Sequence, residues 1–377
     1  MIVLLSALVL VIWIYLIGFH GQFWRSSPVL DVGVPSGKPN LAVIVPARNE
    51  AENIRQSLCS LLAQDYPGEF AIIVVDDNST DITADIVASL AADKRLTIIT
   101  GAPLPVDWTG KMWAVHQGLA NEIANAAVYV LLTDADIVHA PDHLSSLVAK
   151  AEADDLDLVS EMVYLHCVTS AERALIPAFV FFFQMLYPFA WVANPKRLFA
   201  GAAGGTMLVN RAALDRIQGV FAIRNRLIDD CALAKQIKST GGRIWLGHSE
   251  RTLSVRVYSR WRDVWSMIAR TAFEQLHYSF LMVLGCIIGI SIVFCAPPLL
   301  AALARGLPRL LGLLSWMMMA LAFQPTLRRY CRTPLWGFVL PCISLFYLCA
   351  TLASAFQYYA GRGGAWKSRI YPERPTQ

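Results

Sequence analysis

The sequence predicts an α/β domain with a mainly parallel sheet, flanked at both ends by transmembrane helices. Three observations give this prediction. Short apolar runs alternate with amphipathic helical stretches between about residues 38 and 270, a pattern typical of a parallel sheet covered by helices. Long uncharged runs occupy both ends of the chain. Hydrophobic residues make up 56% of the chain and charged residues only 16%, which does not suit a wholly soluble protein.

The N-terminal segment, residues 1–18, is an uncharged run dominated by Leu, Ile and Val. It is about long enough to cross a bilayer. Because it lacks the basic start and the small-residue cleavage site of a signal peptide, we predict a retained transmembrane anchor over residues 1–20.

A βαβ unit opens the domain. Its helical stretch places Ile54, Leu58, Leu61 and Leu62 on one face, between two apolar runs. Five short apolar runs in all predict strands: 41–45, 70–75, 96–99, 128–132 and 156–159.

Polar motifs follow three of these strands, where parallel sheets bind their ligands. "PARNE" follows the first strand, "DDNSTD" the second and "TDAD" the fourth. In the last motif Asp134 and Asp136 repel each other unless water or a cation compensates them, and Mg²⁺ and Mn²⁺ prefer such oxygen ligands. Neither G-x-G-x-x-G nor a Walker A motif is present, which disfavours a Rossmann dinucleotide site and the usual phosphate-loop ATPases.

An apolar run at 174–195 interrupts the domain and contains Pro177, Pro188 and Pro195, which disfavour a straight transmembrane helix. A single crossing there would separate "TDAD" from the later acidic motif "DDCAL" by a membrane. We therefore predict an interfacial helix pair or a re-entrant segment that receives a lipid. A buried core helix is the alternative.

The C-terminal part, residues 276–358, predicts about three spans, and a tail follows at 359–377. The cluster of Arg328, Arg329 and Arg332 favours the cytoplasmic side of a membrane. With the 38–270 domain on that side too, the third span would place the basic tail outside, in conflict with the positive-inside rule.

Net charge and cysteine spacing argue against a nucleic-acid-binding protein and against a disulfide-bonded protein. A charge of +4 is too small to argue for a nucleic-acid partner. Eight cysteines without a C-x-x-C pair predict reduced, packing thiols.

Six motifs in order resemble the family 2 glycosyltransferases with the GT-A (nucleotide-diphospho-sugar transferase) fold, over about residues 39–265. They are "VIVPARNEAENI", "VVDDNSTD", "TGKMWAVHQGL", "LLTDAD", "GAAGGTMLVNRAAL" and "DDCAL". With the apolar ends, the chain most resembles the bacterial hopene-associated subgroup, a membrane group linked to hopanoid lipid synthesis. This resemblance implies a nucleotide-sugar donor and, usually, inversion at the anomeric carbon.

The resemblance also implies the roles of individual residues. Donor-binding positions are Pro46, Ala47, Arg48, Glu50, Asp77 at the uridine, Lys111 at the phosphates, and Asp134 through the ribose or a water. Asp136 is the expected ligand of a divalent Mg²⁺ or Mn²⁺, with Asp134 as its partner. Asp76 is expected to be structural. His248 either completes this metal site or is a hydrogen-bonded structural histidine.

The catalytic motif departs from the family pattern. Asp229-Asp230 stands where the family often has Glu-Asp, and we expect Asp230 to be the general base. Asp229 either orients Asp230 or the acceptor, or caps the helix that follows. In place of Q/R-x-x-R-W, "VYSRW" has Val257 at the first position but keeps Arg260 and Trp261, which the resemblance places at the donor.

These expectations describe an inverting glycosyltransferase in a bacterial inner membrane, with its catalytic domain facing the cytoplasm. It is expected to move a sugar from a UDP-sugar to the hydroxyl of a lipid, and a hopanoid is the favoured acceptor. Polyprenyl-phosphate sugar transfer and polysaccharide synthesis are the enzymatic alternatives. A catalytically silent nucleotide-sugar-binding scaffold is the non-enzymatic one. It would not need Lys111, Asp134, Asp136 and Asp230 together.

Overall fold

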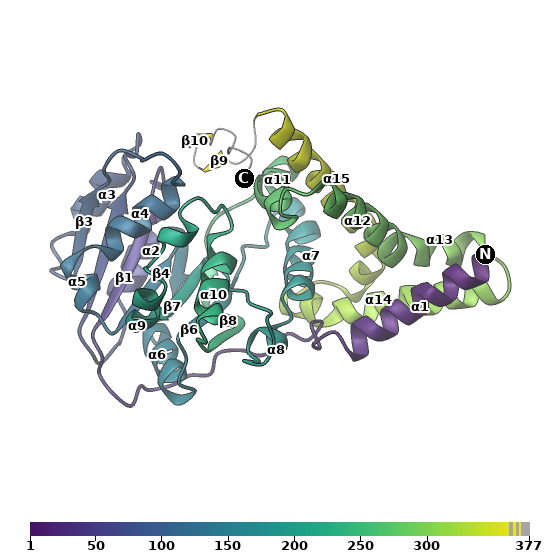
Figure 1. Ribbon diagram of the computed structural model, residues 1–377, viewed down its shortest axis with the longest axis horizontal. Coiled ribbons are helices and arrows are strands. Elements are labelled where there is room, and N and C mark those ends of the chain that lie inside the picture. Colours follow the sequence, from purple (N-terminus) through teal and green to yellow (C-terminus); the bar gives the residue numbers. More distant parts are fainter. Residues whose placement is uncertain (362–364, 367–368, 371–377) are drawn as a thin grey trace.

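The computed structural model describes residues 1–361 and the backbone of a short strand pair, β9 Ala365–Trp366 and β10 Arg369–Ile370. Most of the predicted tail at 359–377 lies outside the described residues. Figure 1 shows an α/β domain on one side and an extension of long helices on the other, with the N-terminus at the far end of that extension.

The domain is built on an eight-stranded sheet of order β3-β2-β1-β4-β7-β6-β8-β5. Pairing is parallel from β3 to β4 and between β6 and β8, whereas β7 is antiparallel to both neighbours and β5 is antiparallel to β8. The strands are β1 Leu41–Ala47, β2 Phe70–Asp76, β3 Leu96–Thr100, β4 Tyr129–Thr133, β5 Ile137–His139, β6 Leu158–Tyr164, β7 Thr206–Asn210 and β8 Ile244–Ser254.

The five predicted strands correspond to β1, β2, β3, β4 and β6. Strands β5, β7 and β8 were not predicted. Polar residues interrupt the apolar pattern of β8, "IWLGHSERTLS", and β5 has only three residues, so periodicity carries little signal for either strand.

Alternation along the strands gives the sheet two apolar faces. Ile44 packs into one core with Val75, while its neighbours Val43 and Val45 pack into the other, because successive side chains point to opposite faces. The covering helices are α2 Ile54–Leu62, α3 Thr83–Leu90, α4 Gly110–Leu119, α5 Glu122–Ala126, α6 His143–Ala153, α9 Arg211–Arg216, η1 Phe221–Ile223 and α10 Asp229–Ser239.

The helical extension contains α1 Ile2–Gly18, α12 Phe280–Ile290, η2 Ser291–Cys295, α13 Ala296–Leu303, α14 Leu307–Arg329, η3 Pro334–Val339 and α15 Leu340–Tyr359. Within the described residues, four helical segments are long and apolar enough to cross a membrane: Ser170–Val192, Phe280–Leu303, Leu307–Arg329 and Pro334–Tyr359. The last three match the spans expected at 276–358. Helix α1, with 17 residues, is shorter.

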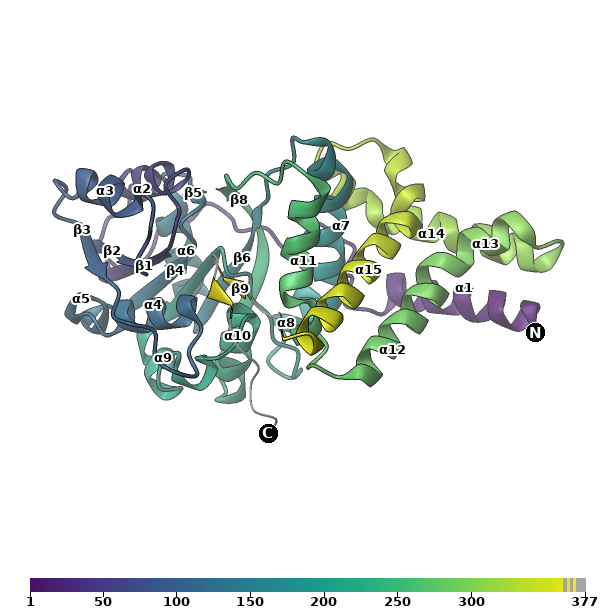
Figure 2. The same ribbon diagram turned by 90° about the horizontal axis from the view of Figure 1, so that it is seen from above.

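Two helices, α7 Ser170–Leu186 and α11 Trp261–Gln275, join the domain to the extension (Figure 2). One side of α7 packs Ile176 and Val180 on the core of the sheet, and the other packs Leu175 and Phe181 among the long helices. The run predicted at 174–195 therefore forms a helix pair, α7 with α8 Phe189–Val192. Most of α7 is buried, which fits the buried-helix alternative.

Candidate active site

A cavity of about 640 Å³ lies between the carboxyl ends of the central strands and helices α7 and α11. Its polar wall includes seven of the predicted site residues: Pro46, Glu50, Lys111, Asp134, Asp136, Asp229 and Asp230. Helices α7 and α11 add apolar side chains to the lining: Phe179 and Phe183 from α7 with Trp265 and Met267 from α11.

Strand pairing explains why motifs far apart in the sequence meet here. Strand β1 pairs in parallel with β4, with Ile44 opposite Leu132. The loop after β1 and the acidic motif after β4 therefore leave the sheet at the same edge, as expected for the ligand edge of a parallel sheet. Glu50 and Asp136 consequently line one cavity.

Lys111 lies in the first turn of α4, which Thr109 caps by accepting a hydrogen bond from the backbone N–H of Met112. Its Nζ is 2.9 Å from Asp134 Oδ1 and 3.1 Å from Asp229 Oδ2. Burial lowers the pKa of Lys111, but these carboxylates outweigh it and hold the pKa above its usual value. The lysine therefore stays charged in the cavity.

Arg256 is a cavity residue that the sequence did not predict. It follows β8, and its guanidinium bridges two carboxylates: Nε donates to Asp136 Oδ2 at 2.6 Å and Nη2 to Glu50 Oε1 at 2.7 Å. Burial raises the pKa of Asp136, and Arg256 opposes that shift. No sequence motif marks Arg256, because its partners lie 120 and 206 residues away along the chain.

Asp230 and Asp229 begin α10 but face different partners. Asp230 Oδ2 accepts a hydrogen bond from the backbone N–H of Gly204 at 2.8 Å, whereas Asp229 pairs with Lys111. Burial and the adjacent Asp229 raise the pKa of Asp230 to about 6, against the opposing effect of Lys111. Asp229 does not cap the helix, since Ile228 occupies that position without a side-chain bond.

The carboxylates fit a hard divalent cation by chemistry, because both acidic residues of "TDAD" present oxygens to the cavity. Among residues 1–361, however, no group of three or more His, Cys, Asp and Glu side chains forms a complete metal cage. A cation bound by Asp134 and Asp136 would complete its coordination with oxygens of water or of a bound phosphate.

His248 does not join these carboxylates. It is fully buried, its ring packs against Phe189 with centroids 5.0 Å apart, and burial lowers its pKa to about 3. Neither ring nitrogen has a hydrogen-bond partner among the described residues, contrary to the expected hydrogen-bonded histidine.

Five predicted residues do not line the cavity: Ala47, Arg48, Asp77, Arg260 and Trp261. Arg48 Nη1 donates to the carbonyl oxygens of Asp77 and Asn78, and it lies 3.8 Å from Asp77 Oδ2. This contact joins the ends of β1 and β2.

Arg260 is the N-cap of helix α11, and Trp261 is the first residue of that helix. The backbone N–H of Arg260 donates to Asp263 Oδ2 at 2.8 Å, and the half-exposed Trp261 contacts Phe346. Their role at the donor stays a prediction. Arg226 and Arg270, which the sequence did not single out, line the cavity instead.

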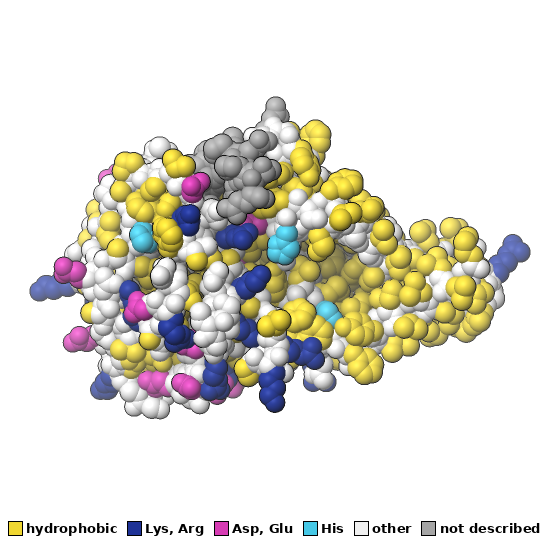
Figure 3. Space-filling view, in the orientation of Figure 1, with side chains coloured by type: hydrophobic (Ala, Val, Ile, Leu, Met, Phe, Trp, Pro, Cys, Tyr) yellow, Lys and Arg dark blue, Asp and Glu magenta, His cyan; other side chains and the backbone are white. Residues whose placement is uncertain are grey.

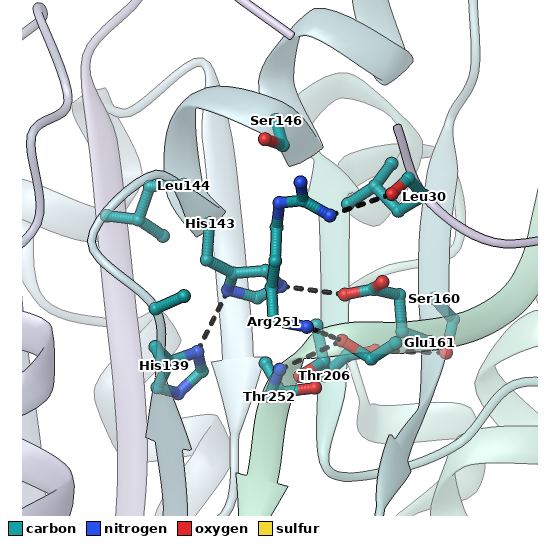
Figure 4. A network of polar contacts seen from close by, with 12 residues as sticks. Leu30, His139, His143, Leu144, Ser146, Ser160, Glu161, Thr206, Arg251 and Thr252 are labelled. Atoms are coloured by element: carbon teal, nitrogen blue, oxygen red, sulfur yellow. Dashed lines mark hydrogen bonds and ion pairs between the residues drawn. The ribbon is translucent and has the colours of Figure 1, made fainter. Parts of the chain in front are cut away.

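A buried polar network joins Glu161, His143 and His139 (Figure 4) and continues to Thr133, the residue before the acidic motif. Glu161 Oε2 is 2.7 Å from His143 Nε2, whose Nδ1 is 2.9 Å from His139 Nδ1. His139 Nε2 lies 3.2 Å from the hydroxyl of Thr133, which donates to the carbonyl of Gly205 at 2.8 Å. Burial raises the pKa of Glu161 to about 8 and lowers that of His143 to about 3, so the network is uncharged at neutral pH.

Comparison with known proteins shows what this fold and site resemble. Residues 42–218 match the model of "Glycosyl transferase family 2". This segment is therefore similar to that family of glycosyltransferases.

The chain aligns with only part of the length of each of these relatives. The chain is 35% identical over 98 residues to a 4,4'-diaponeurosporenoate glycosyltransferase of Staphylococcus aureus (26% of this chain, 24% of the relative). It is 34% identical over 121 residues to an N-acetylglucosaminyltransferase of Bradyrhizobium elkanii (31% and 63%). It is 27% identical over 207 residues to the probable glycosyltransferase YdaM of Bacillus subtilis (54% and 46%).

One solved structure resembles nearly the whole chain. The mannosyltransferase PcManGT of Pyrobaculum calidifontis, in complex with GDP-Man and Mn²⁺, aligns with a TM-score of 0.57 at 20% identity, covering 95% of this chain and 98% of that one. At this identity the likeness establishes the shared GT-A fold, as the sequence predicted.

Proposed function

We propose that this protein is an inverting, membrane-bound glycosyltransferase that moves a sugar from a UDP-sugar to the hydroxyl of a lipid. One observation carries the proposal: Asp230, with a pKa of about 6, shares a cavity with Lys111, the acidic motif and the apolar side chains of α7 and α11. A carboxylate with this pKa is mostly ionised at pH 7 yet basic enough to take a proton.

The donor is proposed to lie along the strand ends. Arg48 and Asp77 lie beside the nucleotide position, and Lys111 meets the diphosphate with its charge at a helix N-terminus. Asp134 and Asp136 would hold a divalent Mg²⁺ or Mn²⁺, which supplies positive charge to the departing diphosphate. The related fold that contains GDP-Man and Mn²⁺ is consistent with this donor class.

The chemical step uses the carboxylate of Asp230. As the acceptor oxygen bonds to the anomeric carbon, Asp230 takes its proton, and the bond from that carbon to the diphosphate oxygen breaks with its electron pair going to the diphosphate. The Gly204 N–H, 2.8 Å from Asp230 Oδ2, fixes the carboxylate for this transfer.

The acceptor is proposed to be a lipid because helices α7 and α11 add large apolar side chains to the cavity. Phe179, Phe183, Trp265 and Met267 belong to the helices that join the domain to the long apolar helices. A hopanoid is favoured by the motif resemblance, and one relative is itself named for 4,4'-diaponeurosporenoate. A second candidate is a lipid phosphate, which Arg226 and Arg270 in the cavity would favour.

A membrane location follows from the surface of the extension. Figure 3 shows hydrophobic side chains covering the long helices, while most charged side chains in view gather on the sheet domain. Leu281, Leu303 and Phe356 are among the exposed apolar residues there, and such a surface fits lipid contact. We place the 38–270 domain on the cytoplasmic side of a bacterial inner membrane.

The test is direct. Membranes containing the protein are incubated with labelled UDP-sugars, and the lipid extract is analysed by mass spectrometry beside membranes containing Asp230→Asn. A labelled hopanoid supports the leading proposal, and a labelled polyprenyl phosphate supports the second. Absence of any labelled lipid with every UDP-sugar would refute both.

A further inference from the structure

Two basic side chains, Lys111 and Arg256, each form ion pairs with two carboxylates of the cavity. Lys111 contacts Asp134 and Asp229 at 2.9 and 3.1 Å. Arg256 contacts Asp136 and Glu50 at 2.6 and 2.7 Å. The proposed metal residues therefore have different basic partners, and among the described residues Arg256 is the basic side chain that forms an ion pair with Asp136.

The contact between Arg256 and Asp136 competes with a metal for the same carboxylate. A guanidinium N–H on Oδ2 is a short, charge-assisted hydrogen bond, and a cation that approached this oxygen would also meet the positive charge of Arg256. The Asp136 side chain is only 9% exposed, so bulk salt screens the pair little.

The backbone on both sides of Arg256 is held in place. Val255 N–H donates to the carbonyl of Asp136 at 2.9 Å, and Tyr258 N–H donates to Glu172 Oε1 at 2.7 Å. The Arg256 side chain is 30% exposed and lines the cavity. A change of Arg256 partner therefore needs only side-chain rotation.

We infer that Arg256 closes Asp136 to divalent cations in the donor-free protein and exchanges onto phosphate oxygens when a nucleoside diphosphate brings the cation. The planar fork of Arg256 suits phosphate as well as carboxylate. Metal binding and diphosphate binding are thereby coupled, and such coupling is reciprocal. This inference rests on the proposed function, since it assumes a metal-dependent nucleotide site.

The experiment measures Mn²⁺ binding to the purified full chain in detergent, from the electron paramagnetic resonance signal of free Mn²⁺, with and without UDP. For the unchanged protein we expect weak Mn²⁺ binding alone and much tighter binding with UDP. Without UDP, Arg256→Gln should bind Mn²⁺ about 10-fold tighter than the unchanged protein, within the usual range of such couplings. The further gain in Mn²⁺ affinity on adding UDP should be smaller for this variant than for the unchanged protein.

Arg226→Gln is the matched control. It removes one positive charge from the same cavity, but the Arg226 guanidinium lies 3.9 Å from Glu274 and not on the acidic motif. Its Mn²⁺ affinity should stay within about twofold of the unchanged protein, as expected for independent sites. If Arg256→Gln misfolds, Arg256→Lys, which keeps the charge without the fork, should give an intermediate affinity.

Equal Mn²⁺ affinity in Arg256→Gln and the unchanged protein would overturn the inference, as would an equal gain in Arg226→Gln. Failure of the proposed function gives a different result. In that case UDP binds to none of the variants in calorimetry, or UDP leaves Mn²⁺ binding of the unchanged protein as it was.

Discussion

Two adjacent carboxylates at the start of α10 have separate environments, and this separation supports different proposed roles. Asp229 Oδ2 lies 3.1 Å from Lys111 Nζ, so Asp229 forms an ion pair with the lysine. Asp230 accepts hydrogen bonds from the backbone N–H groups of Gly204 and Cys231, and burial raises its pKa to about 6. These environments are the basis for proposing Asp230 as the base, and that role stays a prediction.

Replacement of this base should separate chemistry from binding. Asp230→Asn keeps the shape of the side chain, so UDP-sugar affinity in calorimetry should stay near native, while the initial transfer rate falls roughly 10²- to 10⁴-fold. Asp229→Asn should be milder. A wild-type rate for Asp230→Asn, or an inactive Asp229→Asn, would place the base on the wrong residue.

The raised pKa of Asp230 predicts the pH dependence of transfer. A general base acts only when ionised, so activity should be present above pH 6 and decline as pH falls through about 6. The measurement is kcat/KM between pH 5 and 8. A decline centred near 4, the ordinary value for Asp, would show that Asp230 is not perturbed as described.

Metal removal tests the acidic motif. Because Asp134 and Asp136 are proposed to hold a cation on the diphosphate, chelation should abolish transfer, and Mg²⁺ or Mn²⁺ should restore it. Asp136→Asn should lose most activity while its circular dichroism spectrum stays unchanged. Full transfer by metal-free protein would remove this role.

At the level of elements, Thr133 joins two parts of the site. It ends β4 immediately before the acidic motif, and its hydroxyl donates to Gly205, next to the glycine whose N–H holds Asp230. The strands β4 and β7 are antiparallel with Thr133 opposite Thr206. The acidic motif and the base are therefore fixed relative to each other through one buried side chain.

Thr133→Val should test this connection. The substitution keeps the volume but removes the Thr133 hydroxyl from the Gly205 carbonyl and from His139 Nε2. The free energy of unfolding should therefore fall by about 1–3 kcal/mol, and kcat should fall more than donor affinity. Thr252→Val is the control, because the hydroxyl of this buried threonine makes no hydrogen bond among the described residues. Equal thermal midpoints and rates for the two variants would contradict the positioning role.

At the level of the whole molecule, the end of helix α14, which carries the arginine cluster, contacts the sheet domain. Arg329 donates to the carbonyl of Ser249 in β8, and Tyr330 stacks on Tyr164 with ring centroids 4.7 Å apart. The end of α14 must therefore lie on the same side of any membrane as the domain, which agrees with the positive-inside expectation for Arg328, Arg329 and Arg332.

Topology reporters should confirm this arrangement. Fusions after Gly37 and within the 328–332 loop should both report the cytoplasm, since both positions lie beside the sheet domain. A fusion at Gln377 adds the side of the tail. A periplasmic signal from either of the first two positions would overturn the proposed orientation and the access to cytosolic UDP-sugars.

The sequence by itself determined the strands with clear apolar periodicity, the long apolar helices and the motifs that meet at the cavity. These features depend on residues near one another in the chain, because strand and helix periods are local. Asp134, Asp136, Lys111 and Asp230 could be chosen for the same reason, since their motifs are short and follow predicted elements.

Only the tertiary structure decided the antiparallel insertion of β7, the burial of α7 between two cores, and the partners of each charge. Arg256 reaches Asp136 across 120 residues and Glu50 across 206, and Lys111 joins the ends of two separate elements. Ion pairing depends on distance in space, which the fold sets and local sequence patterns do not contain.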